Sequence, residues 1–406
     1  MNGRRTYALA LAVTALVAGV GAAASTGVTA GTANTAGKTG TANTAGAAST
    51  DSERQAVRPK PTPTAKSSAT PTPTPSATQL DGTLQILTYR GYAEYGGVSS
   101  RVNWVGSFER ETGCRIARLD IAQTAEELAA RVGDRPYDLV TAGPALAADL
   151  IRRGQARPID PAKVSGYNDL DKRFRDMTTV SGKVYGVPYL WAYDEFVRDR
   201  RAGGGLDDVF SSTRSALRDS PLTIAAAALA EGAKDPYELS EADLDKAMAL
   251  LDRNKDRTYW RNPIDLIKGF ATGALDYAQV TPYYRTLLQK AGVPVETIKT
   301  RATTGWLDSW LLTSTIPDTT CAYRWLNWVT AADAQRDAAA WTGMAPASEK
   351  ACKGRARAMC RTYGMGDDKR LDRVRFAVRP PGDCRAGDGE CTDYATWAKR
   401  WQELMK

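Results

Sequence analysis

The chain of 406 residues contains no histidine, and its six cysteines include no C-x-x-C pair. Without imidazole, a serine or cysteine triad that uses histidine as its base is excluded. Most zinc sites are excluded as well, because they depend on histidine or on clustered cysteines. The sequence also lacks a G-x-S-x-G elbow, so a secreted enzyme is the least favoured class of function. We expect no metal and no other cofactor.

The chain also has little net charge where its fold is expected. Of the net charge of +8, half lies in the first 81 residues, which hold seven basic and three acidic side chains. Residues 82–406 carry 47 basic against 43 acidic side chains, and no Lys/Arg run dominates them. Such a balance gives no extended positive field, so we expect no nucleic-acid partner. The length of this part favours two domains or lobes.

Residues 1–24 are predicted to be a secretory signal peptide. Arg4 and Arg5 precede an apolar stretch, and three small residues, Ala22–Ala24, suit signal peptidase. The alternative is an uncleaved membrane anchor, because the stretch is about long enough to span a bilayer. No cysteine lies near this site for lipid attachment. We therefore expect a secreted, extracytoplasmic protein, free or at the cell surface.

Residues 25–81 are predicted to be a disordered linker rich in Thr, Ala and Pro. The heptapeptide Gly31–Gly37 recurs unchanged as Gly40–Gly46, and Pro-Thr repeats follow from Pro61. The segment lacks the large apolar side chains whose burial would offset the entropy lost on ordering. The fold is therefore expected to begin at residue 82.

Residues 82–406 are predicted to form an α/β fold, because short apolar strands alternate with amphipathic helices. This alternation predicts a mostly parallel sheet covered on both faces, which binds ligands at the carboxyl ends of its strands. Capping patterns at Thr124 and Ser240 mark two helix starts. The other predicted elements are strands at Leu84–Tyr89, about Arg115–Ile121 and Tyr137–Val140, and helices ending at Gly113 or spanning Ala145–Arg153 and Cys321–Val329.

A series of short motifs follows in order along residues 82–406: Leu84–Tyr92, Ser107–Gly113, Arg135–Val140, Arg157–Asp160, Tyr185–Trp191, Asp219–Pro221, Asp235–Leu239, Thr304–Asp308, Cys321–Trp325 and Gly343–Cys352. In this order and spacing the chain resembles the polyamine-type (spermidine/putrescine) periplasmic substrate-binding proteins of ABC importers. Asp235–Leu239 and the motifs after it fit a branch of that family associated with actinobacteria. The resemblance covers nearly all of residues 82–406.

The resemblance implies a two-lobe periplasmic-binding-protein-like fold of type II, with discontinuous lobes joined by a hinge. We expect residues 82–197 with 309–345 to form lobe 1, and residues 198–308 with 346–406 to form lobe 2. The ligand would bind in the cleft, and the lobes would close over it.

The implied function is that of an extracytoplasmic solute-binding receptor of an ABC importer, and not that of an enzyme. Its partners would be a small-molecule ligand, a membrane permease and an ATPase, and we expect a monomer. The alternative is a secreted or surface interaction module on the same fold, with a decayed ligand site. The missing lipidation motivates this alternative, because a free protein is harder to keep beside a permease.

A polyamine site needs carboxylates for the ammonium groups and aromatic faces for the methylenes. Trp306 and Asp308 match the family pattern, so Trp306 would stack on the ligand and Asp308 would pair with an ammonium. The alternative is a core tryptophan and a turn-capping aspartate. Trp310, next to this motif, is predicted to be buried packing.

Four further residues are candidates for ligand contact. Tyr89 stands where relatives have a tryptophan, and Tyr92 would line the same mouth. Trp191 lies near the expected hinge, where packing is the favoured alternative. Asp219 would either approach a cation or cap the helix at Ala225–Ala230.

Several positions depart from the polyamine pattern, namely Gly143, Ala145, Ser220, Thr223, Thr281 and Met344. Their loss of charged and aromatic partners would leave a buried ammonium unpaired, at a cost of roughly several kcal/mol. We therefore expect a polyamine or a related smaller amine or polar solute, with tight polyamine binding in doubt.

The six cysteines and the expected export predict up to three disulfides, among fifteen pairings. Cys384 with Cys391 is the favoured pair, because a flexible loop separates them. Cys352 can pair with Cys360 only if the helix ends between them, since eight residues of continuous helix span about 12 Å.

Overall fold

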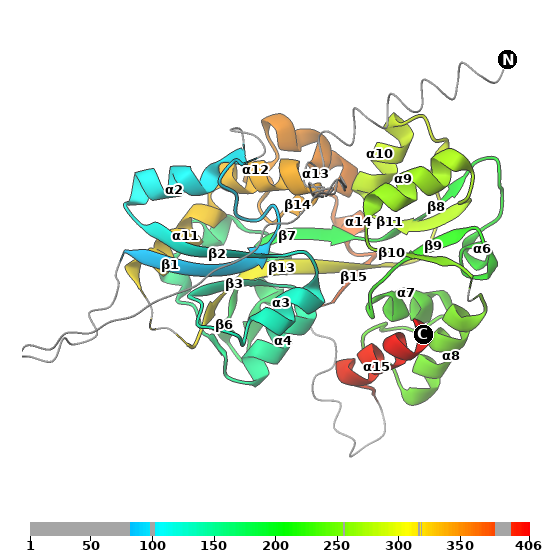
Figure 1. The fold of residues 1–406 in the computed structure, drawn as a ribbon, viewed down its shortest axis with the longest axis horizontal. Coiled ribbons are helices and arrows are strands. Elements are labelled where there is room, and N and C mark those ends of the chain that lie inside the picture. The colour runs from blue at the N-terminus through cyan, green and yellow to red at the C-terminus, as the bar shows by residue number, and fades with distance from the viewer. Residues whose placement is uncertain (1–81, 98–101, 255, 316, 318, 378–390) are drawn as a thin grey trace, which may run out of the picture. The chain divides into compact units, whose positions relative to one another are not determined.

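The computed structural model describes residues 82–97, 102–254, 256–315, 317, 319–377 and 391–406. The predicted signal peptide and linker lie outside these residues. The described residues form two large sheets and one two-stranded sheet, with helices packed around the large sheets (Figure 1). Within the described part of the chain, no helix combines the length and apolar character of a membrane span.

The first sheet has the strand order β14-β7-β13-β3-β1-β2, with β4 and β15 also paired to β13. β1 runs parallel to β2 and β3, whereas β13 runs antiparallel to β3 and β7. The prediction of a mostly parallel sheet is therefore wrong, because β7 and β13 are long return strands outside the strand–helix–strand units. The strands are β1 (Thr83–Tyr89), β2 (Arg115–Ala122), β3 (Leu139–Ala142), β4 (Ala156–Arg157), β7 (Gly186–Tyr193), β13 (Thr303–Thr313), β14 (Ala345–Pro346) and β15 (Val374–Ala377).

Helices cover both faces of this sheet, as predicted (Figure 1). On one face α2 and α11 bury Phe108 and Trp325 against Trp310, which is fully buried as expected. On the other face α3 and α4 bury Leu128 and Leu150. The helices here are α2 (Trp104–Thr112), α3 (Ala125–Arg131), α4 (Pro144–Arg152), α5 (Lys172–Met177), α11 (Thr320–Thr330), α12 (Ala332–Thr342), α13 (Arg357–Tyr363) and α14 (Asp368–Leu371).

The predicted helix signals act as expected in the structure. The side chain of Thr124 accepts a hydrogen bond from the backbone N–H of Glu127, and Ser240 does the same for Asp243. Gly113 ends α2 with a φ of 74°, a left-handed conformation that favours glycine. A hairpin of β5 (Thr179–Val180) and β6 (Lys183–Val184) and four 3-10 turns complete this part, at Pro161–Lys163, Tyr167–Asp169, Glu349–Ala351 and Gly354–Ala356.

The second sheet has the order β10-β9-β11-β8-β12 and is also mixed. Its strands are β8 (Glu195–Asp199), β9 (Ser215–Arg218), β10 (Thr258–Trp260), β11 (Tyr277–Val280) and β12 (Val295–Thr297). Its helices are α6 (Leu206–Ser211), α7 (Thr223–Ala230), α8 (Glu241–Asp252), α9 (Pro263–Thr272), α10 (Pro282–Lys290) and α15 (Tyr394–Leu404). A second core forms where α7, α8 and α15 pack together, with Trp397 fully buried.

The chain passes between the sheets at two described places. Asp194 alone separates β7 from β8, and residues 298–302 separate β12 from β13. The first passage is bonded to the start of β13, directly after the second passage, because the backbone N–H of Asp194 donates to the carbonyl of Thr304 (2.8 Å) and the hydroxyl of Thr303 donates to the carbonyl of Asp194 (2.5 Å). The predicted lobe boundaries differ from the sheets: they divide β13 and β14 and assign β15 to lobe 2, whereas all three strands lie in the first sheet and α15 packs with the second. The lobes as moving bodies remain a prediction.

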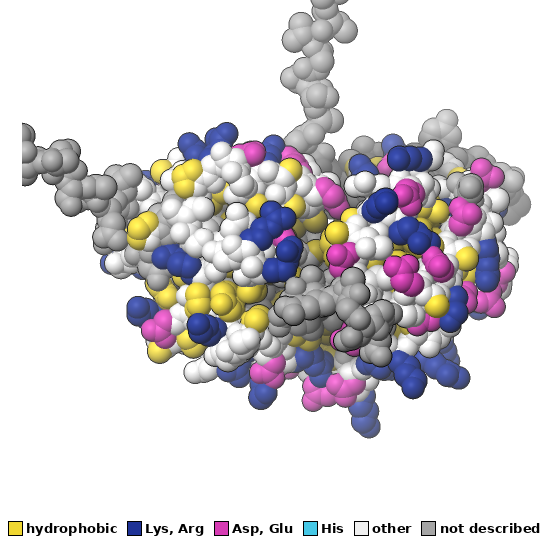
Figure 2. Space-filling model, turned by 90° about the horizontal axis from the view of Figure 1, so that it is seen from below, with side chains coloured by type: hydrophobic (Ala, Val, Ile, Leu, Met, Phe, Trp, Pro, Cys, Tyr) yellow, Lys and Arg dark blue, Asp and Glu magenta, His cyan; other side chains and the backbone are white. Residues whose placement is uncertain are grey.

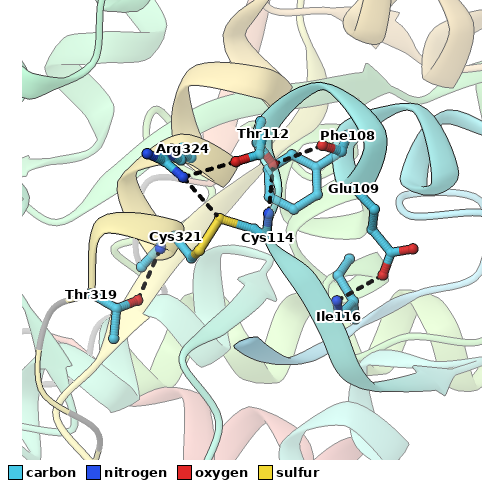
Figure 3. The surroundings of a disulfide bond; sticks show 9 residues. Phe108, Glu109, Thr112, Cys114, Ile116, Thr319, Cys321 and Arg324 are labelled. Carbon is cyan, nitrogen blue, oxygen red and sulfur yellow. Dashed lines mark hydrogen bonds between the residues drawn. A yellow bond between two sulfur atoms is a disulfide. The ribbon is translucent and has the colours of Figure 1, made fainter. Parts of the chain in front are cut away.

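Two disulfides join elements that pack around the first sheet. Cys114, directly before β2, is bonded to Cys321 in α11, across 207 residues of sequence (Figure 3). Cys352 is bonded to Cys360, and the predicted condition holds because a turn ends before α13 begins at Arg357. Cys391 is disulfide-bonded, and Cys384 lies outside the described residues.

The surface agrees with the balanced charge of the sequence. On the face drawn in Figure 2, basic and acidic side chains are interspersed, and neither sign forms a continuous field. On this face, the distribution is that of an ordinary solvated surface.

Candidate ligand-binding site

A cavity of about 790 Å³ opens between helices of the first sheet and strand ends of the second. From the first sheet come side chains of α3 and α4, together with Trp306 on β13. From the second come the loops after β9, β10 and β11 and one face of α15. The volume falls in the range of small-molecule sites, which favour such interfaces.

Parallel strands of the second sheet end at this cavity. β9 and β10 run parallel and end at Arg218 and Trp260, both of which line it. β11 runs parallel to β9, and its following residue Thr281 also lines the cavity. The predicted location at the carboxyl ends of strands therefore matches the position of the cavity.

Arg218 lies against two indole rings in the wall of the cavity. Its guanidinium carbon is 4.2 Å from the ring centre of Trp306 and 5.4 Å from that of Trp260. The two tryptophans come from different sheets, so the guanidinium joins them across the interface. Such cation–π contacts stabilise a cation by about 0.5–2 kcal/mol each.

The ion pair of Arg218 lies at the passage between the sheets. Its Nη2 donates to Oδ1 of Asp194 at 2.8 Å, and Oδ2 of that carboxylate accepts from the hydroxyl of Thr304 at 3.1 Å. Burial raises the pKa of Asp194, and the Arg218 guanidinium lowers it. Because Asp194 belongs to the passage, the position of Arg218 is tied to the connection between the sheets.

Asp308 lies behind Trp306 and does not line the cavity. Its side chain accepts a hydrogen bond from the hydroxyl of Tyr92 at 2.5 Å, and only 5% of the residue is exposed. A Cβ placed on Gly143 would come within 3.0 Å of Oδ1, so the loop after β3 closes over this carboxylate. Burial raises the pKa of Asp308 to about 6, while Tyr92, Trp306 and Arg218 each lower it.

The predicted contacts Asp219, Tyr92 and Tyr89 differ in whether they line the cavity. Asp219 lines the cavity, where it accepts from Nε of Arg261 (2.5 Å) and from the indole N–H of Trp401 (3.0 Å). The alternative that Asp219 caps α7 is wrong, because α7 has no side-chain cap. Tyr92 is buried and packs against Tyr89 with ring centres 5.4 Å apart, and neither lines the cavity.

Trp191 is fully buried in the first core, as the packing alternative predicted. Its indole N–H donates to the carbonyl of Pro346 at 2.9 Å, and its ring lies 5.2 Å from that of Phe174. The structure therefore places Trp191 away from the cavity.

Four of the positions that depart from the polyamine pattern line the cavity: Ala145, Ser220, Thr281 and Met344. None of them carries a charge, so the cavity lacks carboxylates where the resemblance places some of its polyamine contacts. The residues that the sequence did not single out include Arg218, Trp260, Tyr283, Tyr284 and Tyr394. Arg218 and Trp260 each end a strand that was not among the predicted elements, so their position at the cavity had no signal in the prediction.

Comparison with known families decides what kind of protein carries this site. The model of the family described as bacterial extracellular solute-binding protein matches residues 103–355. The chain belongs to this family. Its match includes α3, α4, Arg218, Trp260 and Trp306 of the cavity wall.

Solved structures with the same fold include other solute-binding proteins. A protein named as a spermidine/putrescine ABC transporter of Listeria monocytogenes is similar at 16% identity, with a TM-score of 0.62 over 80% of this chain and 98% of that one. The Atu4243 GABA receptor matches at 20% identity and a TM-score of 0.62, over 80% and 98%. The MotA protein of A. tumefaciens B6, in complex with glucopine, matches at 16% identity and 0.59, over 80% and 100%. At these identities the likeness shows the fold, which is the predicted two-lobe periplasmic-binding-protein-like one.

Proposed function

We propose that this solute-binding protein is the extracytoplasmic receptor of an ABC importer and that its solute binds in the cavity between the two sheets. The observation that carries the proposal is the cavity itself, which lies at strand ends of the second sheet and is walled by helices of the first. Transfer to a membrane permease with its ATPase would follow from the family. No chemistry on the solute is proposed, because family and neighbours are transport proteins.

Closure of the cavity would move one sheet against the other about the two passages at Asp194 and residues 298–302. Hinges of this kind are a few residues at the ends of elements that absorb the change in backbone angles. Trp306 and Asp219 would contact the solute directly. Asp308, Tyr92 and Tyr89 would support the wall from behind, because none of them lines the cavity.

A polyamine is a weaker candidate than a smaller or less cationic polar solute. One face of Trp306, which the resemblance assigns to polyamine methylenes, lies against the Arg218 guanidinium. Of the four acidic side chains in the wall, Asp149 and Asp219 are already paired with arginines, and Asp393 accepts from the backbone N–H of Thr396, which leaves Glu126. An ammonium chain would thus meet a cation and few unpaired carboxylates, an arrangement that disfavours polycations.

A thermal-shift screen of the full chain with amines, amino acids and sugars tests the receptor function, followed by calorimetry of the hits. A solute at a hundred times its Kd stabilises the folded state by about 2.7 kcal/mol, which raises the midpoint measurably. A flat response to the whole panel would contradict the receptor and favour the interaction module. Tight spermidine binding would contradict the preference for a less cationic solute.

A further inference from the structure

The guanidinium of Arg218 has more donors than the protein uses. A guanidinium carries five N–H groups. Among the residues that the structure describes, Arg218 makes one side-chain hydrogen bond, from Nη2 to Asp194. Its Nε is buried without a partner there, and 22% of the side chain is exposed towards the cavity that it lines. Because Nε is closed off by burial, the donors left for an acceptor in the cavity are those of Nη1 and the second N–H of Nη2.

The other arginines in the cavity wall differ from Arg218. Arg152 and Arg153 both pair with Asp149 on their own helix, and Arg261 pairs with Asp219. Their side chains are at least half exposed, so water satisfies their remaining donors. Arg218 is held between two indole rings instead, where water has less access and a ligand oxygen gains more.

The carboxylate of Asp194 does not bond the remaining N–H donors of the Arg218 guanidinium. It divides its two oxygens between Arg218 and the hydroxyl of Thr304, and it is only 6% exposed. The carboxylate of Asp308 is bonded to Tyr92 and lies outside the cavity wall. Of the acidic side chains that line the cavity, Asp149, Asp219 and Asp393 have other partners and Glu126 is exposed, so none of them is bonded to Arg218.

We propose, on the basis of the proposed receptor function, that the solute carries a carboxylate group and that Arg218 binds it. Trp306 and Trp260 would hold the guanidinium in one orientation, so that two parallel N–H groups meet the two oxygens. The aromatic wall, which also includes Tyr283 and Tyr284, would pack on the body of the solute. The solute class is thus a small carboxylate, such as an amino acid or a dicarboxylate.

The test uses pairs of probes that differ only in the carboxylate. α-Amino acids, ω-amino acids and dicarboxylates are screened at 1–10 mM, a range of roughly millimolar affinities, beside their amides and the corresponding diamines. We expect at least one carboxylate to raise the thermal midpoint of the full chain and its amide to fail. Arg218→Met is expected to weaken that probe about 100-fold by calorimetry, and Arg218→Lys about 10-fold, because lysine keeps the charge and loses the fork.

Arg214→Met is the matched control, because Arg214 precedes the same strand, pairs with Asp276 and does not line the cavity. It should bind the probe as the unchanged protein does. Since Arg218→Met leaves Asp194 without its partner, the double variant with Asp194→Asn separates lost folding from lost binding. If a diamine, amide or sugar binds and Arg218→Met leaves its affinity unchanged, the proposal of a carboxylate solute is wrong. The proposed receptor function is then retained. Absence of any binding across both probe classes would overturn both proposals.

Discussion

Arg218 and Asp308 both lie beside Trp306, but Arg218 lines the cavity whereas Asp308 is buried. Arg218 ends a strand of the second sheet and lines the cavity beside Trp306. Asp308 lies on the first sheet two residues beyond Trp306, where Tyr92 bonds it and the Gly143 loop covers it. Of these two charges, the cation from the second sheet lines the cavity, and the anion of the motif is buried.

The two sheets on which these residues lie, each with its helices, also differ in what they contribute to the molecule. The first sheet and its helices carry two disulfides and a large aromatic core behind Trp306. The second supplies Arg218, Trp260 and the paired Asp219 from strand ends and loops. We infer that the first part acts as a rigid support, the platform, and that side chains of the second part recognise the solute.

The largest expected effect comes from breaking the platform. Replacing Cys114 and Cys321 by alanine should lower the free energy of unfolding by about 2–5 kcal/mol, because this disulfide closes 207 residues. Replacing Cys352 and Cys360, which close only 8 residues, should cost about 3 kcal/mol less. Denaturant unfolding of both variants, followed at the first core, measures the difference. Equal losses would show that chain entropy does not set the contribution of these bonds.

The next effect concerns the buried anion. The pKa of Asp308 is raised from its ordinary value of 3.8 to about 6, chiefly by burial. Between these values the folded state holds a proton that the unfolded state has lost, so this group's stabilisation is complete below pH 3.8 and is lost as pH rises past 6. The unfolding free energy of the unchanged protein should therefore fall by roughly 2–3 kcal/mol relative to that of Asp308→Asn as pH rises across this window.

Asp194 also has a raised pKa, but it is present in both proteins and cancels in their difference. Parallel stability profiles for the two proteins would mean that Asp308 is more hydrated than its 5% exposure implies. The carboxylate would then be available to a solute cation, and the contrast with Arg218 would fail.

Local signals were sufficient to predict much of the fold. Strand β1, the start of α3 at Thr124 and the glycine end of α2 follow from alternation and capping, which act over a few residues. The mixed sheet was missed, because the return of β13 beside β3 and β7 is a long-range pairing without a local pattern. The resemblance, not periodicity, carried the two-lobe architecture.

The site was predicted only in part, for a physical reason. The motif Trp306-x-Asp308 identified the right strand, but alternation along a strand does not reveal what covers each side chain. Burial of Asp308 depends on Tyr92 and Gly143, which are more than 160 residues away in sequence. Arg218 was overlooked since an arginine at a strand end is also common on ordinary surfaces, and its setting between two indoles requires both sheets.

The smallest expected effect tests whether the platform touches the solute at all. Trp306→Ala should weaken the best carboxylate probe about 10-fold, because it removes one ring that orients Arg218 and packs on the solute, a loss of about 1–2 kcal/mol. Trp306→Phe keeps an aromatic face and should recover most of that affinity. Calorimetry at constant pH measures both, with the thermal midpoint of each free variant as the folding control. If Trp306→Ala binds the probe as tightly as the unchanged protein, side chains of the second sheet both recognise and hold the solute. The platform would then only support Arg218 from behind.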